Sequence, residues 1–149
     1  MEKIITNINL IDSTGMLKSH SEIKIIETEE NTYVEISVFY NQKEYTGKGT
    51  DHLWVDAFAD LQRNLPANVK LACCMTCKHG SMCPFGDFAR ELHCTKDFKI
   101  NDKSELIDLF TNDNFYENNK VLCDSYCDDY EPQNKDYFTY NDYRYEMFF

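Results

Sequence analysis

The stretch Val69-Lys-Leu-Ala-Cys-Cys-Met-Thr-Cys-Lys-His-Gly80 marks the point at which the chain changes character. Residues 69–73 form a short apolar run, which predicts a buried strand. This strand leads directly into Cys74 and Cys77, a CxxC pair. Two thiolates at this spacing on a tight turn can bind one metal ion from the same side, and Gly80 permits the turn. We therefore expect a metal-binding region to begin here.

The number of cysteines favours metal binding over disulfides. The chain has 149 residues and seven cysteines, so a full set of disulfide pairs cannot form. Residues 1–7 lack the features of a signal peptide, and no apolar run is long enough for a transmembrane helix. We therefore expect a cytoplasmic protein, not associated with membranes, whose thiols stay reduced. In that compartment a cysteine cluster more often binds metal than forms a disulfide framework.

A closed metal site needs two further ligands downstream of the CxxC pair. The candidates are Cys83, Cys94, Cys123 and Cys127. Cys94 lies 16 intervening residues beyond Cys77, a normal distance for a second half-site. Cys127 begins a polar turn after an expected strand at 121–126. The preferred ligands are Cys74, Cys77, Cys94 and Cys127.

Three residues near these cysteines also bear on the choice of ligands. His79 and His93 are alternative ligands, because Cys₃His sites are common for zinc. For each of them an ordinary surface side chain is the simpler interpretation. Cys73 precedes the CxxC pair on the strand, so we expect it to point away from the metal as a small buried side chain.

The same region resembles an uncharacterised bacterial family. In that family a helix ending in Leu-Pro leads to a CxTC turn, a Pro-x-Gly turn, a third cysteine, a Lys…Leu-Phe segment and a late Cys-x-x-Phe/Tyr. The matching residues here, within roughly 53–131, are Leu65-Pro66, Leu71, Cys74-Met-Thr-Cys77, Pro84-Phe-Gly86, Leu92-His-Cys94, Lys103, Leu109-Phe110 and Cys127-Asp-Asp-Tyr130. This chain is shorter at its start, and Lys78–Met82 replaces a more hydroxyl-rich loop. The resemblance implies the same four cysteine ligands and no activity.

Four thiolates suit either zinc or an iron–sulfur cluster. Closed Cys₄ zinc sites mostly serve folding, and zinc is the preferred cofactor. The alternative is a [4Fe–4S] cluster shielded by aromatic side chains. Four aromatic residues could provide that shield or belong to the core: Phe85, Phe88, Phe98 and Tyr126.

The first half of the chain predicts an antiparallel β-meander followed by a helix. Strands are expected at 3–11, around Ile23 and Ile25, at 33–40 and at 43–48, with a two-residue turn at Asn41-Gln42. A helix is expected over 51–65, packed on the sheet through Leu53, Phe58 and Leu61 and ended by Pro66.

The second half predicts one shorter helix, Lys103–Phe110, where Asp102 and Glu105 form a capping-box pattern. The segment Thr111–Lys120 is rich in Asn and Asp and predicts an exposed loop. The fold class is therefore α+β, in one domain over 1–149. Its parts are a meander with a packed helix (1–70), a cysteine-rich metal-binding layer (71–131) and an aromatic tail (132–149).

Charge and composition bear on partners. A net charge of −11 repels the phosphate backbone, so we expect no nucleic-acid binding and instead a possible basic protein partner. Seven of the thirteen residues from Tyr137 to Phe149 are aromatic. Such a tail either completes the sheet as a last strand or forms a binding surface. The candidate binding residues are Tyr140, Tyr143, Tyr145 and Phe149.

These observations favour a non-enzymatic protein stabilised by a structural zinc site, of a protein-binding, inhibitor or immunity type. The alternative is an iron–sulfur protein for electron transfer or redox sensing that uses the same cysteines. The HExxH, Walker, GxSxG and dinucleotide motifs are absent from the sequence, and we assign no catalytic residue. The sequence identifies neither the oligomeric state nor the partner.

Overall fold

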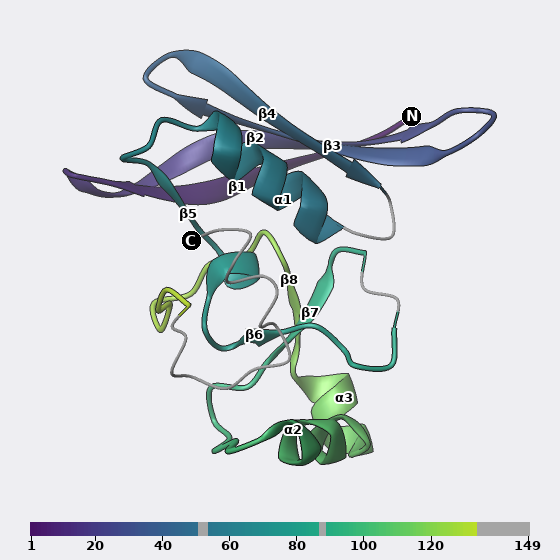
Figure 1. The fold of residues 1–149 in the computed structure, drawn as a ribbon. Helices are drawn as coiled ribbons and strands as arrows, with labels where there is room; N and C mark the ends of the chain where they lie inside the picture. Colours follow the sequence, from purple (N-terminus) through teal and green to yellow (C-terminus); the bar gives the residue numbers. More distant parts are fainter. Residues whose placement is uncertain (51–53, 87–88, 134–149) are drawn as a thin grey trace. The chain divides into compact units, whose positions relative to one another are not determined.

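The computed structural model describes residues 1–50, 54–86 and 89–133. The chain divides into two compact units, Met1–Ala72 and the part from Cys73 onwards. The first unit is a curled antiparallel sheet with one helix, and the second is a smaller sheet with two helices (Figure 1). The α+β fold class is therefore confirmed. Within the described residues, no helix is both long and apolar enough to cross a membrane.

The first unit is built from five strands and a helix that follow one another along the chain. They are β1 (Glu2–Asp12), β2 (Gly15–Glu27), β3 (Thr32–Tyr40), β4 (Lys43–Thr50), α1 (Trp54–Asn64) and β5 (Lys70–Ala72). The strand order is β4-β3-β2-β1-β5, and every neighbouring pair is antiparallel. The predicted meander and helix are confirmed, and β5 completes the sheet by pairing with β1.

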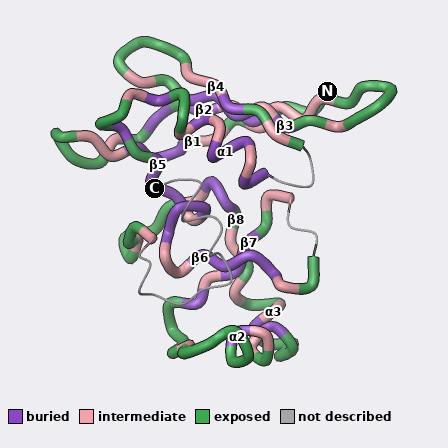
Figure 2. Tube along the Cα trace, in the orientation of Figure 1, coloured by how far each residue is buried: buried purple, intermediate pink, exposed green. Residues whose placement is uncertain are grey.

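The hydrophobic core of this unit comes from the alternation along the strands. Val34, Ile36 and Val38 share one face of β3 and are fully buried. On α1, Phe58 and Leu61 are also fully buried, as the helical spacing of apolar residues predicted. Burial runs along α1 and the middle of the sheet, whereas the hairpin ends are exposed (Figure 2). Leu53, the third predicted packing residue, lies outside the described residues.

The turn between β3 and β4 has the conformation that two-residue hairpins favour. Asn41 and Gln42 have φ of 50° and 65°, so both lie in the left-handed region that a type I′ turn requires. Asparagine tolerates this region better than most side chains. The predicted two-residue turn is thus confirmed.

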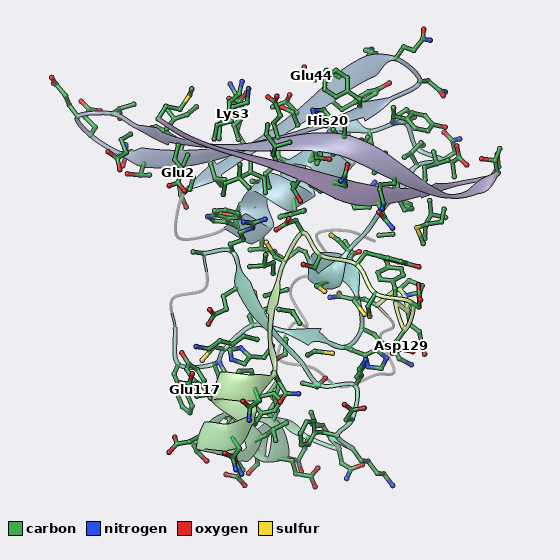
Figure 3. All side chains as sticks on the ribbon, turned by 180° about the vertical axis from the view of Figure 1, so that it is seen from behind. Glu2, Lys3, His20, Glu44, Glu117 and Asp129 are labelled. Carbon is green, nitrogen blue, oxygen red and sulfur yellow. The ribbon has the colours of Figure 1, made fainter. Side chains whose placement is uncertain are left out.

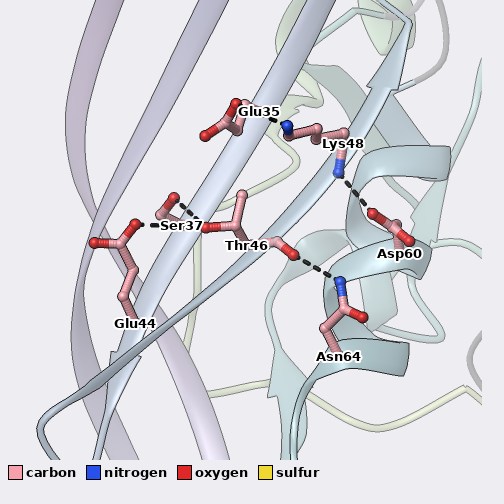
Figure 4. Close-up of polar contacts among 7 residues, drawn as sticks. All are labelled: Glu35, Ser37, Glu44, Thr46, Lys48, Asp60 and Asn64. Carbon is pink, nitrogen blue, oxygen red and sulfur yellow. Dashed lines mark hydrogen bonds and ion pairs between the residues drawn. The ribbon is translucent and has the colours of Figure 1, made fainter.

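Helix α1 also contacts both edge strands of its sheet through polar side chains. Asp60 accepts a hydrogen bond from the Lys48 amide of β4 (2.9 Å), and Asn64 donates to the Thr46 carbonyl (2.8 Å) (Figure 4). At the other edge, Gln62 accepts from the Leu71 amide and donates to the Val69 carbonyl, each at 2.9 Å. These bonds satisfy edge groups that could otherwise pair with another chain.

The face of the sheet opposite α1 carries polar and charged side chains. Lys3, His20 and Glu44 project from it (Figure 3). Lys3 forms an ion pair with Glu22 at 3.1 Å across β1 and β2. Oppositely charged cross-strand neighbours stabilise such a solvated face modestly.

The second unit consists of short elements around an irregular chain. They are the 3₁₀ turn η1 (Cys74–Thr76), β6 (Gly80–Ser81), β7 (Glu91–Cys94), α2 (Lys103–Phe110), α3 (Asp113–Asn118) and β8 (Lys120–Leu122). The strands form an antiparallel sheet in the order β6-β7-β8. Helix α2 has the predicted bounds, and the Asp102 carboxylate accepts from the Glu105 amide at its start.

Two predictions for this unit are wrong. Residues 111–120, predicted as an exposed loop, contain helix α3, which begins at the Asn112 cap and buries Phe115. The strand predicted at 121–126 is only Lys120–Leu122, because the chain turns at Ser125, whose amide donates to the Leu122 carbonyl (3.0 Å).

A small apolar cluster joins α2 and α3. Its buried members are Cys83, Leu106, Phe110 and Phe115. His93 of β7 is 2% exposed, and its ring centroid lies 4.9 Å from that of Phe110 in an edge-on arrangement. Helices α2 and α3 thus pack on β7 through apolar and aromatic side chains.

Candidate metal centre

The CxxC pair lies on a tight turn directly after β5. The Cys77 amide donates to the Cys74 carbonyl (3.3 Å), and the Gly80 amide donates to the Cys77 carbonyl (3.1 Å). A Cβ atom at Gly80 would lie 2.2 Å from the Cys74 carbonyl oxygen. The turn therefore needs glycine at this position because there is no space for a Cβ atom.

The third cysteine reaches this turn through the small sheet. In the β6–β7 pair Gly80 lies opposite Cys94. The next residue, Thr95, donates its amide to the His79 carbonyl at 2.9 Å. Cys94 is therefore fixed beside the CxxC turn by backbone hydrogen bonds.

The fourth cysteine is brought to the same turn by the segment after β8. The Cys74 amide donates to the Ser125 carbonyl (2.8 Å), and the Met75 amide donates to the Cys123 carbonyl (2.9 Å). After Cys127, the Lys78 amide donates to the Glu131 carbonyl (2.8 Å). The chain thus passes along the CxxC turn both before and after Cys127.

Three of the four predicted ligands line one cavity. Cys74, Cys94 and Cys127 border a space of about 520 Å³ whose other walls include Leu122 and Tyr126. Cys77 is buried, Cys74 and Cys94 are half-buried, and Cys127 is exposed. Three segments distant in sequence therefore converge with their cysteines on one place.

The cysteines do not form a finished coordination shell. Across residues 1–50, 54–86 and 89–133, no three His, Cys, Asp or Glu side chains are grouped so that they could hold a metal ion. Residues 71–131 are therefore cysteine-rich and compact, but the structure does not show the predicted metal-binding layer.

The thiols lie within electrostatic range of one another. Burial raises the pKa of Cys74 far above its ordinary value, and its electrostatic coupling to the neighbouring cysteines raises it further. Burial likewise raises the pKa of Cys94, which the Lys96 amide partly offsets. Without a cation, several thiolates at this place would repel one another. A metal ion is the kind of group that would remove the repulsion.

Thr76 and Tyr130 form a link that the sequence did not reveal. The Thr76 hydroxyl lies 3.0 Å from the Tyr130 hydroxyl, and Thr76 also donates to the Cys73 carbonyl at 3.2 Å. Burial raises the pKa of Tyr130 strongly. These are the Thr of CxTC and the Tyr of Cys-x-x-Tyr, so the contact joins the turns that carry the first and last of the four predicted ligands.

The other cysteines are buried away from solvent. Cys73, Cys83 and Cys123 are all at most 6% exposed. Burial raises the pKa of Cys73 to about 12, which keeps it a neutral thiol. The prediction of a small buried side chain at Cys73 is therefore confirmed.

The two alternative histidine ligands have other surroundings. The interpretation of His93 as an ordinary surface side chain is wrong. His93 packs among aromatic rings, and its Nε2 lies 3.0 Å from the Tyr116 carbonyl oxygen. His79 lies 3.9 Å from the Glu131 carboxylate. Burial lowers the pKa of both histidines.

The aromatic residues proposed as a shield are mostly exposed. Phe85 is 63% exposed, Phe98 37% and Tyr126 36%, so Phe85 and Phe98 are not core residues. Tyr126 borders the cysteine cavity. Phe88 and the four candidate binding residues of the tail, Tyr140, Tyr143, Tyr145 and Phe149, lie outside the described residues.

No protein-family model fits the chain, and no curated protein resembles it significantly.

Proposed function

We propose that this chain is a non-enzymatic protein whose second unit is stabilised by one structural zinc ion bound to Cys74, Cys77, Cys94 and Cys127. The observation that carries the proposal is the convergence of three separate segments on one cavity bordered by Cys74, Cys94 and Cys127. Four thiolates are a donor set that zinc accepts in tetrahedral geometry. Binding requires the four sulfurs to approach one another, by rotation about their Cα–Cβ bonds and shifts of the turns.

The size of the second unit supports a structural role. Its strands span two to four residues each, and its helices α2 and α3 have eight and six residues. Small units built from such short elements usually need a metal or disulfides. Binding of a structural zinc contributes on the order of 10 kcal/mol to folding.

Metal analysis tests the site. Native protein, purified without added metal, should contain one zinc per chain. Cys74→Ser, Cys77→Ser, Cys94→Ser and Cys127→Ser should each lose zinc and become less soluble. Cys83→Ala and Cys123→Ala are the matched controls, and alanine is preferred there because a serine hydroxyl would be buried. Equal loss of zinc from Cys83→Ala and Cys94→Ser would contradict the ligand set.

The cellular role that we propose is protein binding, as in an inhibitor or immunity-type protein. The net charge of −11 would steer a basic partner, and the aromatic tail would supply anchors. Deleting residues 137–149 should leave unfolding unchanged but abolish salt-sensitive copurification of a basic protein from cell extract. Loss of the fold would instead assign the tail to the core.

A second candidate is a [4Fe–4S] protein for electron transfer or redox sensing. The cavity of about 520 Å³ beside Cys74, Cys94 and Cys127 favours it, because a cluster needs more space than one ion. Anaerobic purification separates the candidates. A brown protein that absorbs near 400 nm and contains iron and sulfide would support the cluster and contradict the zinc site. A colourless protein that contains zinc would contradict the cluster.

A further inference from the structure

Arg90 and Asp124 form a buried, two-pronged ion pair in the second unit. Arg90 Nε lies 2.7 Å from Asp124 Oδ1, and Arg90 Nη2 lies 2.9 Å from Oδ2. Asp124 is 2% exposed. A carboxylate so deeply buried is tolerated when it is paired and hydrogen-bonded, and the guanidinium fork supplies both bonds in fixed geometry.

The pair joins the segments that carry the third and fourth ligands. Arg90 immediately precedes β7, which ends at Cys94, and Asp124 lies between β8 and Cys127. The Cys123 amide also donates to the Arg90 carbonyl at 2.8 Å. The main chain and the side chains thus fasten the two segments at the same point.

The β7–β8 ladder cannot do this alone. Its register runs from His93↔Lys120 to Glu91↔Leu122, and β8 ends at Leu122. From there the chain turns toward Cys127, and backbone hydrogen bonds from Cys74 and Met75 hold this turn to the CxxC turn. The Asp124 carboxylate adds a side-chain contact from the turn to Arg90, the residue that precedes β7. Without the ion pair, the turn would keep its backbone bonds but lose this side-chain contact to the segment that leads to Cys94.

We propose that Arg90 and Asp124 are positioning residues of the metal centre, whose ion pair, together with the backbone hydrogen bonds of the same turns, sets the separation of Cys94 and Cys127. The inference rests on the proposed function, because it assumes that these cysteines are ligands. Partners outside the ligand shell that orient ligands in this way typically contribute about 10–100-fold to metal affinity.

The test is titration of the metal-free full chain with Co²⁺ in the presence of a competing chelator, followed by thiolate-to-cobalt absorption. Asp124→Asn keeps the size of the side chain but removes its charge and one acceptor. We expect about 10–100-fold weaker Co²⁺ affinity with one ion still bound per chain. Arg90→Lys keeps the positive charge but cannot make both hydrogen bonds of the guanidinium group. Its loss of Co²⁺ affinity should be smaller than that of Asp124→Asn.

Glu22→Gln is the matched control, because it removes a carboxylate from the Lys3 ion pair in the first unit and should leave Co²⁺ affinity unchanged. A role limited to stability predicts that Asp124→Asn, once saturated with Co²⁺, has the wild-type absorption bands. Positioning predicts shifted bands, because the ligand geometry differs. If Asp124→Asn does not fold, Arg90→Lys carries the test.

Two outcomes overturn the inference in different ways. Wild-type affinity and wild-type bands in both Asp124→Asn and Arg90→Lys would refute the positioning role while leaving the four-cysteine site intact. No thiolate absorption in the wild-type chain would refute the metal centre itself, and the positioning role with it.

Discussion

Gly80 is the residue on which the geometry of the CxxC turn depends. A methyl group there would overlap the Cys74 carbonyl oxygen, which is backbone and cannot rotate away. A substitution at this position is disfavoured by the lack of space for a Cβ atom and not by the backbone φ.

Gly80→Ala should therefore open the turn. We expect loss of bound metal and a fall in the free energy of unfolding of about 1–3 kcal/mol, the usual cost of overpacking. Metal content and chemical denaturation measure the two effects. Gly15→Ala is the control: φ of 117° makes it strained, but no atom lies within 4 Å of the new Cβ. It should destabilise the protein without changing metal content, and equal metal loss from both variants would contradict the role of Gly80.

Asp12 carries a local pH response in the first unit. Hydrogen bonds from the Thr14 hydroxyl (2.6 Å) and the Tyr40 hydroxyl (2.8 Å) lower the pKa of Asp12 below its ordinary value of 3.8. Because the folded pKa is below the unfolded one, these bonds stabilise the fold above pH 3.8, and the contribution is lost as the pH falls through the folded pKa.

Tyr40→Phe should move the pKa of Asp12 back toward 3.8, because one of the two side-chain donors is removed. An NMR titration of the Asp12 side chain measures the change. Tyr33→Phe, on the same strand, is the control and should leave the pKa of Asp12 as it is. An unchanged pKa in Tyr40→Phe would show that the hydroxyl does not donate to the carboxylate in solution.

At the scale of elements, the packing of α1 on β4 is governed by glycine. A Cβ atom at Gly47 would lie 2.3 Å from the Ala57 carbonyl oxygen and 2.3 Å from the Leu61 amide nitrogen. Helix and strand therefore meet backbone to backbone, which explains why α1 can also bind the edge of β4 through Asp60 and Asn64.

Gly47→Ala should displace α1 from the sheet. We expect a loss of about 3 kcal/mol or more in the free energy of unfolding, since backbone and not a flexible side chain must move. Lys48→Ala, next in sequence and exposed, should cost less than about 0.5 kcal/mol. Denaturant unfolding monitored by circular dichroism compares them, and similar values for the two variants would refute the close contact.

Elements with a regular apolar period were predictable from the sequence. Apolar and polar residues alternate along the strands, and α1 has an apolar stripe. The start of α2 is marked by the capping pattern of Asp102 and Glu105. Helix α3 was missed because Asn and Asp surround a single deeply buried side chain, Phe115. The signals that were present are the Asn112 cap and the adjacent aromatic pair Phe115-Tyr116.

For the candidate site, the sequence predicts which cysteines to consider as ligands, and the structure brings their segments together. That they bind metal stays a prediction. The Thr76–Tyr130 and Arg90–Asp124 contacts join residues 54 and 34 positions apart, and no local pattern shows that the two partners meet. Contacts of this kind follow from the fold and not from any short stretch of sequence.

At the scale of the whole molecule, we expect the proposed metal to stabilise one compact unit and not the other. The four cysteines all lie after Ala72, where the first unit ends. The core of the first unit, centred on Phe58 and the strands, includes none of the four cysteines.

Removal of the metal with a chelator should therefore speed amide hydrogen exchange from Cys73 to Gln133 and leave the central strands β1 to β3 protected. The physical reason is that the binding free energy of a structural metal is folding free energy for the unit that binds it. Exchange measured by mass spectrometry on peptides resolves the two regions. Uniform loss of protection along the chain would show that the metal stabilises both units together.

The pairing of β5 with β1 has a consequence for the order of events during synthesis. The β1–β5 ladder pairs Asn9, Leu10 and Ile11 with Ala72, Leu71 and Lys70, which are made much later. The other ladders, from β1 to β4, join strands that are adjacent along the chain. On the ribosome the local hairpins can therefore form early, and the edge of β1 stays open until residue 72 emerges. The next residues to appear are the CxxC turn, and Cys127 follows much later. We therefore expect each newly made chain to pass through an interval in which the N-terminal sheet is complete but the proposed metal site still lacks Cys127.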